Sequence, residues 1–89
     1  MTEPTYRRAV DLLEAELGEE MVALDAEAGT CFGFNEVAAT VWRELESPKT
    51  AEDLRTVLLA EYEVDPAQCD RELADLLQEL SARGLIETI

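Results

Sequence analysis

The first third of the chain consists of short strand-like segments separated by turn residues. Residues 10–17 and 20–25 are rich in apolar side chains. The two residues between them, Gly18 and Glu19, form a short turn, and the whole pattern predicts a β-hairpin. A second turn over residues 26–29 leads into the segment 30–34, whose two phenylalanines fall on one face of a strand. Three strands that follow one another in this way predict an antiparallel meander.

The next part of the chain has helical periodicity. Asn35 is a suitable N-cap for a helix over residues 36–46, in which apolar residues recur at three- and four-residue spacing. Thr50, with an acidic residue three positions later, resembles a capping box and predicts a second helix over residues 51–62. Both helices then place a row of apolar side chains on one face.

The third helix has the clearest start signal, an Asp65 cap followed by Pro66 at the first helical position. We predict a helix over residues 66–83 that Gly84 ends, and an extended tail over residues 85–89 that packs on the core. Three strands followed by three helices predict the α+β class, in which helices cover one face of a small three-stranded antiparallel sheet.

The charge of the chain narrows the choice of partners. Its 89 residues include 21 Asp+Glu against 7 Lys+Arg, which gives a formal net charge of -14. A chain of this length supports one core, so we expect a single domain over residues 1–89. So many negative charges repel phosphates and anionic membranes but attract basic peptides. We therefore expect no nucleic acid and no membrane partner, and we expect salt to weaken the binding of a basic peptide.

The chain has few residues suited to catalysis or metal binding. It has no histidine, and Cys31 and Cys69 lack the paired spacing of a zinc site. We expect no enzyme activity, no metal and no cofactor. No apolar run is long enough for a signal peptide or a membrane span, so we expect a cytoplasmic protein with reduced thiols. Two buried thiols are expected rather than a disulfide, although neighbouring thiols would allow oxidation to close a site.

One stretch resembles a known family. Residues 29–42 combine a glycine turn, an aromatic strand, Asn at the strand-to-helix junction and an aliphatic-Trp pair. This order is similar to the PqqD-like family of leader-peptide recognition domains, also called RiPP recognition elements, and the similarity covers residues 10–87. The later segments that match are 50–54, 62–66 and 83–86. Phe34 stands where the family usually has Leu, and Ala38 where it often has Gly, so pocket shape is affected more than fold.

The resemblance implies a winged-helix-like domain without catalytic activity that binds the leader of a ribosomally made precursor peptide. A stand-alone chain of this length looks most like the leader-binding protein of lasso-peptide biosynthesis. Such a protein presents the precursor to a leader-cleaving cysteine protease and a cyclase. A peptide chaperone for a radical-SAM enzyme, as in pyrroloquinoline quinone biosynthesis, is one alternative. A generic acidic protein-interaction module is another.

Two further classes fit the composition but not the motifs. An acyl carrier protein needs an Asp-Ser-Leu site, whereas Ser47 lies between Glu and Pro and Ser81 lies between Leu and Ala. A winged-helix DNA-binding protein needs a basic recognition helix, whereas the third helix predicted here is acidic. Neither class is favoured by the sequence.

Strand addition is the binding mode that we predict, in which an extended leader pairs with the free edge of residues 30–34. The resemblance places the opposite wall of the groove on the third helix. The candidate leader-binding residues are Thr30, Cys31, Phe32, Gly33, Phe34, Cys69, Asp70, Leu73, Ala74 and Leu77. The apolar residues would contact the anchoring apolar side chains of the leader. Asp70 would bind a hydroxyl group or a cation of the leader. Leu73→Arg is then expected to abolish leader binding without unfolding the domain.

Each candidate also has a purely structural interpretation. Phe32, Phe34 and Trp42 have the spacing of core residues. A helix in a small domain must bury an apolar stripe, so only about two of the leucines on the third helix are expected to reach a ligand. These leucines are Leu73, Leu76, Leu77 and Leu80.

Overall fold

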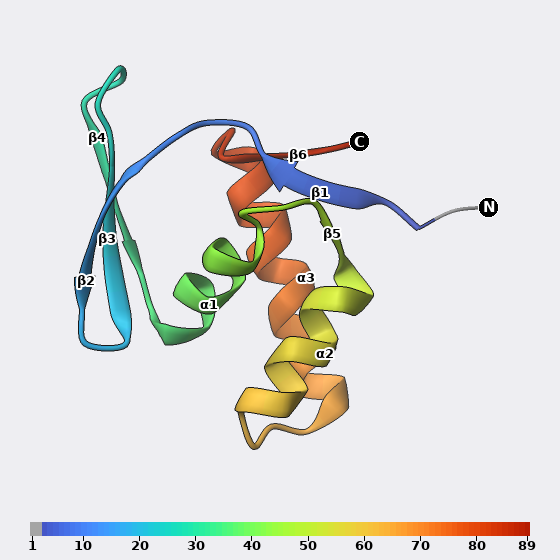
Figure 1. Ribbon diagram of the computed structural model, residues 1–89. Coiled ribbons are helices and arrows are strands. Elements are labelled where there is room, and N and C mark those ends of the chain that lie inside the picture. The colour runs from blue at the N-terminus through green and yellow to red at the C-terminus, as the bar shows by residue number, and fades with distance from the viewer. Residues whose placement is uncertain (1–2) are drawn as a thin grey trace.

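The structure is a computed structural model that describes residues 3–89, and it has a β-sheet beside a body of three helices (Figure 1). The strands are β1 (Thr5–Arg8), β2 (Leu13–Leu17), β3 (Glu20–Asp25), β4 (Thr30–Phe34), β5 (Lys49–Thr50) and β6 (Ile86–Thr88). The helices are α1 (Glu36–Glu44), α2 (Ala51–Glu61) and α3 (Pro66–Ala82). The predicted α+β class is confirmed.

Residues 13–34 form the predicted antiparallel meander. β3 lies between β2 and β4, and its Val22 pairs with Ala15 on one side and with Gly33 on the other. The first strand begins at Leu13 rather than at residue 10, because the segment before it connects the meander to a different sheet. The two later strands have the predicted bounds.

A second three-stranded sheet was not predicted, and the single sheet expected from the sequence is two sheets. β1 is its central strand and pairs antiparallel with both β5 and β6. These strands have only two to four residues and come from distant parts of the chain. No hairpin turn or sustained alternation therefore marks them in the sequence. The predicted tail contains β6, and Leu85 and Ile86 at its start are buried.

The helices begin at the predicted caps and end one or two residues earlier than predicted. Asn35 Oδ1 accepts a hydrogen bond from the Ala38 amide at 2.9 Å. Thr50 and Asp53 form the reciprocal capping box, and Asp65 accepts from two amides of the first turn of α3. Each cap satisfies amides that have no partner within the helix, and a cap of this kind contributes about 1 kcal/mol to stability.

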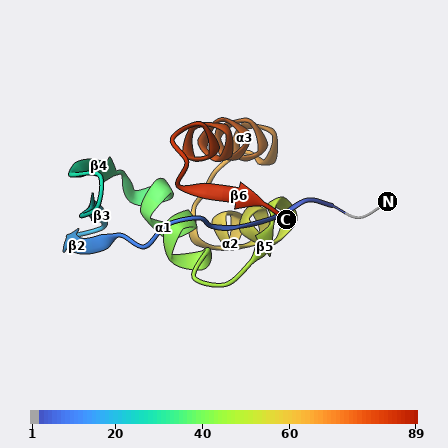
Figure 2. The same cartoon turned by 90° about the horizontal axis from the view of Figure 1, so that it is seen from above.

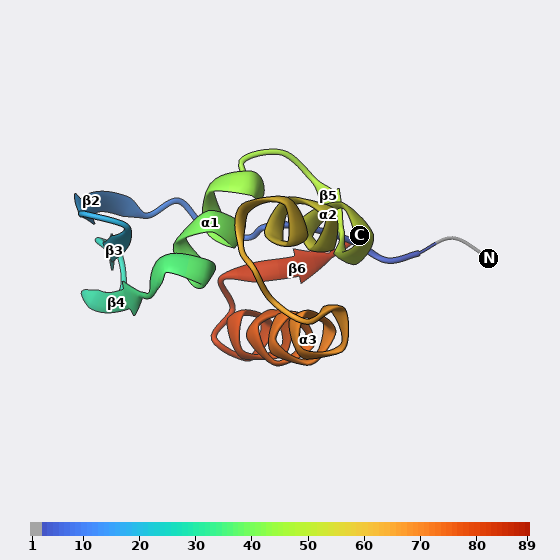
Figure 3. The same ribbon diagram turned by 90° about the horizontal axis from the view of Figure 1, so that it is seen from below.

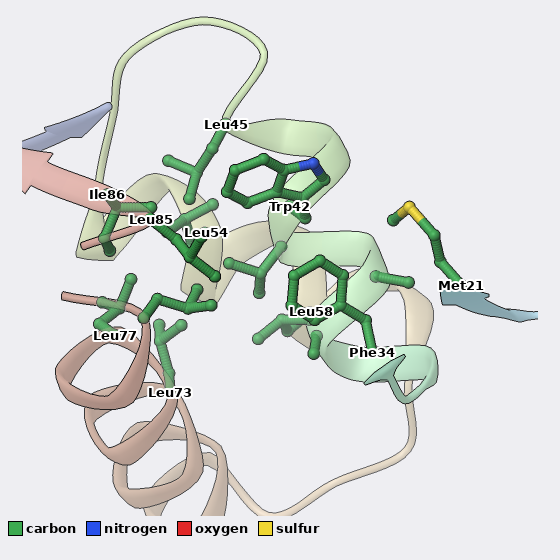
Figure 4. Close-up of a cluster of buried hydrophobic side chains, with 14 of the residues drawn as sticks. Met21, Phe34, Trp42, Leu45, Leu54, Leu58, Leu73, Leu77, Leu85 and Ile86 are labelled. Atoms are coloured by element: carbon green, nitrogen blue, oxygen red, sulfur yellow. The ribbon is translucent and has the colours of Figure 1, made fainter. Parts of the chain in front are cut away.

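Trp42 lies where the meander meets the helices, and its side chain is fully buried (Figure 4). Its ring centroid is 5.7 Å from that of Phe34. The indole Nε1 donates to Glu14 Oε2 at 3.0 Å, and the guanidinium carbon of Arg8 lies 4.4 Å from the ring centroid. One indole thus joins β1, β2 and β4 to α1. The interpretation of Phe34 and Trp42 as core residues is confirmed.

Candidate functional site

β4 has a free edge. It pairs with β3 on one side and with no other strand of residues 3–89. In an edge strand, alternate backbone amides and carbonyls point away from the sheet and remain available for pairing. Phe32 and Phe34 share the inner face of the sheet with the buried Met21 and Ala23 of β3. β4 therefore offers open backbone groups on a strand whose aromatic side chains hold it to the core.

A groove of about 640 Å³ lies between β4 and α3. Seen from above and from below, β4 is the strand of the meander on the same side of the molecule as α3 (Figures 2 and 3). Residues 31–34 line one wall, and Asn35, Val37 and Ala38 extend the lining into α1. The α3 wall is formed by Glu72, Asp75, Leu76, Glu79 and Leu80, with Arg83 just after the helix. The groove is thus open to an extended chain along β4.

α3 turns a different face to this groove from the one predicted. Cys69, Leu73 and Leu77 are at most 4% exposed and lie in the core; Leu73 and Leu77 are seen there in Figure 4. Asp70 and Ala74, together with Leu73 and Leu77, line a second groove, which α3 shares with α2 and β1. The physical reason is that the most apolar stripe of a helix is buried against the rest of the domain. Successive residues of an α-helix are rotated by roughly 100° about the helix axis, so residues next to the buried stripe point in another direction. The face beside the stripe, which mixes apolar and acidic residues, lines the groove.

The structure brings residues 31–34 together with Leu76 and Leu80, whereas Thr30 lies on β4 outside the groove lining. Two of the four leucines on α3 therefore line the groove. A signal for this face exists in the sequence, because leucines interleaved with carboxylates mark a helix face that is only partly buried. Since Leu73 is buried, Leu73→Arg would place a charge in the core and could not separate binding from folding. Leu76 is half-buried and is the better probe.

The α3 wall of the groove is acidic and ends in one cation. Glu72, Asp75 and Glu79 follow one another at helical spacing along this wall. Arg83 forms an ion pair with Glu79 at 3.1 Å, and its guanidinium carbon lies 6.0 Å from the ring centroid of Phe32. The positive charge is therefore held at one end of the groove, beside β4.

A further carboxylate lies where β4 passes into α1. Glu36 stands between the groove-lining residues Asn35 and Val37. Desolvation raises its pKa, and so does the charge of Glu19, with additional repulsion from Glu61. Three carboxylates near one another make this junction strongly negative, so that a cation nearby would be favoured.

The two thiols lie in different environments. Cys31 is exposed on β4 and lines the groove, whereas Cys69 is buried in the core, and both are free. Burial raises the pKa of the Cys69 thiol, and the neighbouring Asp70 raises it further. Because the two thiols do not line the same groove, the hypothesis that their oxidation closes the site has no support in the structure.

Residues 3–89 contain no cluster of three or more His, Cys, Asp or Glu side chains arranged to hold a metal ion. None of the helices in this part of the chain is both long and apolar enough to cross a membrane.

The sequence pattern of the family described as coenzyme PQQ synthesis protein D (PqqD) matches residues 20–86. The chain belongs to the PqqD family. The match includes β3, β4, all three helices and both walls of the groove. The family resemblance found in the sequence is confirmed, and the chain is a PqqD-like RiPP recognition element.

Two solved structures are similar to this PqqD-like chain over most of its length. One is TbiB1 in complex with the TbiA(beta) leader peptide, which is 32% identical with a TM-score of 0.78; the match covers 91% of this chain and 94% of that one. The other is lasso peptide synthetase B1 complexed with the leader peptide, which is 29% identical with a TM-score of 0.73; the match covers 92% and 96% of the two chains. No curated protein sequence matches this chain.

Proposed function

We propose that this protein binds the leader of a ribosomally made precursor peptide and has no catalytic activity of its own. The observation that carries the proposal is the free edge of β4 beside a groove walled by α3. Support comes from two similar structures that are each described as a complex with a leader peptide. The leader would add as a fourth strand to the meander.

Strand addition explains how one small domain can bind an extended peptide. Hydrogen bonds to the free backbone groups of β4 would supply affinity that depends little on the leader sequence. Every second leader side chain would point into the groove, where Phe32 and Leu76 offer apolar contacts above the buried Leu80. These anchored side chains would supply the selectivity. We retain the β4 residues as proposed contacts and assign the α3 contacts to the face that includes Leu76.

We further propose that the precursor is presented to a leader-cleaving cysteine protease and a cyclase of lasso-peptide maturation. The outer face of the meander offers a surface for such a partner. Leu13 is 64% exposed and Leu17 61% exposed, and Leu24 pairs with Leu13 on the same face. Large apolar side chains exposed together mark interaction surfaces in soluble domains. This face continues onto the strand that a bound leader would form.

A peptide chaperone for a radical-SAM enzyme is the second candidate function. The description of the matching family, a protein of coenzyme PQQ synthesis, favours it. Leader binding is common to both functions, so they are separated by the enzyme that the leader-loaded protein activates. A pull-down with each class of enzyme, with and without the leader, would decide between them.

Fluorescence polarisation tests leader binding directly. The probe is the labelled leader of the precursor encoded next to the gene of this protein. We expect saturable binding that weakens at least tenfold, or about 1.4 kcal/mol, in Leu76→Arg, because this side chain lines the groove. The matched control is Ala74→Arg, which places the same exposed charge on the same helix but in the second groove.

The two variants also distinguish the two faces of α3. If Ala74→Arg weakens binding and Leu76→Arg does not, the leader lies in the second groove and the proposed α3 contacts are wrong. If the folded wild-type protein binds no leader, the proposed function itself is wrong. Circular dichroism of both variants would establish that each is folded.

A further inference from the structure

The groove differs in charge between its two ends: one end is negative, and at the other an arginine offsets a carboxylate. Glu72 and Arg83 mark these ends on the α3 wall, and an α-helical rise of 1.5 Å per residue separates them by roughly 16 Å. Arg83 lies beside Phe32, in the middle of β4. The charge therefore changes along the path that a peptide on β4 would follow.

The chain runs in opposite directions along β4 and α3, the two elements that form the walls of the groove. In Figure 1, β4 descends from the β3–β4 turn to the start of α1, whereas α3 rises from its first turn to the C-terminal strand. The start of β4 consequently faces the Arg83 end, and the end of β4 faces the end that contains Glu72.

The carboxylates at the two ends also differ in their partners. Glu79 is paired with Arg83 at 3.1 Å, so this end has almost no net charge. Asp75 and Glu72 have no ion pair with a basic residue of the described chain, although Glu72 accepts a hydrogen bond from Gln68. The unneutralised charge thus lies at the end where β4 passes into α1.

An added strand has a preferred direction. Antiparallel pairing is slightly more stable per residue than parallel pairing and is the more frequent of the two arrangements. A peptide antiparallel to β4 would enter beside Phe34 and Glu72 and would leave beside Arg83 and the β3–β4 turn. Its N-terminal part would then meet the carboxylates, and its C-terminal part the guanidinium.

We infer that this groove selects leaders by the order of their charges: Lys or Arg before the apolar anchor, and neutral or acidic residues after it. The inference rests on the proposed leader binding and adds its direction and charge requirement. Because the modified part of a precursor follows its leader, this direction also places that part next to Arg83 and the β3–β4 turn. The charges would oppose a leader bound in the reverse direction.

The test uses two labelled peptides of the same composition, both derived from the leader of the neighbouring precursor gene. The anchor is first located as the apolar leader residue whose replacement by alanine weakens binding most. One peptide has its basic residues before the anchor, and the other has them moved behind it. Each is titrated at low and high salt with the wild-type protein. Two variants are titrated in the same way, Glu72→Gln/Asp75→Asn in the groove and Glu46→Gln/Glu63→Gln outside it.

We expect the wild-type protein to bind the first peptide about fivefold more tightly at low salt, as exposed ion pairs contribute little individually and are screened. The groove variant should lose this preference, and the control, which has the same change in net charge at exposed positions, should keep it. Equal binding of the two peptides, a reversed preference, or a preference that survives in the groove variant would overturn the inference while leaving leader binding intact. If neither peptide nor the unmodified leader binds the wild-type protein, leader binding fails and the inference falls with it.

Discussion

The two neighbouring faces of α3 have different roles although their sequences look alike. One face, with Leu73 and Leu77, is buried and holds the helix to the domain. The next face, with Leu76 between Asp75 and Glu79, is partly exposed and walls the groove. Both contain leucines at helical spacing. The difference teaches that the position of carboxylates between the leucines, rather than the leucines themselves, distinguishes the groove face from the core face.

The largest effect that separates the two faces is expected from Leu73→Ala. Removing a buried leucine leaves a cavity, and we expect the free energy of unfolding to fall by about 2–5 kcal/mol. Urea denaturation measures this decrease in the free energy of unfolding. The affinity of the folded fraction for the leader should stay within about twofold, because the side chain faces away from the groove. Leu76→Ala is the matched control, and a larger loss of stability there than at Leu73 would contradict the assignment of the faces.

A smaller effect should come from the capping box of α2, the helix that packs against the core face of α3. Hydrogen bonds from the backbone amide and the side chain of Thr50 hold the pKa of Asp53 below its usual value of 3.8. A carboxyl with a lowered pKa in the folded protein stabilises it above the unfolded pKa, and this stabilisation is lost as pH falls through the folded value.

The free energy of unfolding should therefore decrease more steeply on acidification in the wild-type protein than in Asp53→Asn. Urea denaturation at a series of pH values from about 6 to 2 measures both slopes. Leader affinity at neutral pH should be the same in the two proteins, since Asp53 lies outside the groove. Parallel pH curves would show that this cap does not contribute to acid stability.

The smallest expected effect concerns Glu36 at the junction of β4 and α1. Desolvation and the charge of Glu19 raise its pKa, so the folded protein binds this proton more tightly than the unfolded chain. Stability from this group is present at low pH and is lost as pH rises through the raised pKa. Glu36→Gln should accordingly raise the melting temperature slightly at neutral pH, where Glu36 is charged. At a pH low enough to protonate Glu36 in both the folded and the unfolded chain, the substitution should give no gain.

Thermal unfolding at both pH values checks this expectation. Glu63→Gln is a suitable control, because it removes the same charge from an exposed loop position. An equal rise in both variants would attribute the gain to the overall net charge of -14 rather than to the repulsion between Glu36 and Glu19.

Local signals predicted much of the fold. Asn35, Thr50 and Asp65 were identified as caps because an N-cap acts through atoms within three residues of itself. The β3–β4 hairpin was likewise predicted to the residue, since its partners are joined by one short turn. The sheet of β1, β5 and β6 was missed because its pairing joins positions such as Tyr6 and Thr88, which no local pattern connects.

Of the two walls of the groove, the sequence predicted the residues of one. The strand that walls the groove was found from its aromatic pattern and from the glycine turn before it, whereas the residues chosen on α3 lie in the core or in another groove. Helical periodicity shows that a stripe exists, but several neighbouring stripes on α3 contain leucine. Which one is buried depends on how α3 packs against α2 and the second sheet.

The sequence by itself determined the meander and the three helices with their caps, the acidic charge and the family, because these depend on neighbouring residues or on composition. Only the tertiary structure decided that β4 has a free edge, that Leu76 faces it and Leu73 does not, and that Arg83 lies next to Phe32. The physical reason is that rotation of a helix about its axis is set by burial against distant segments. A groove is the surface that remains after the core has taken the most apolar face.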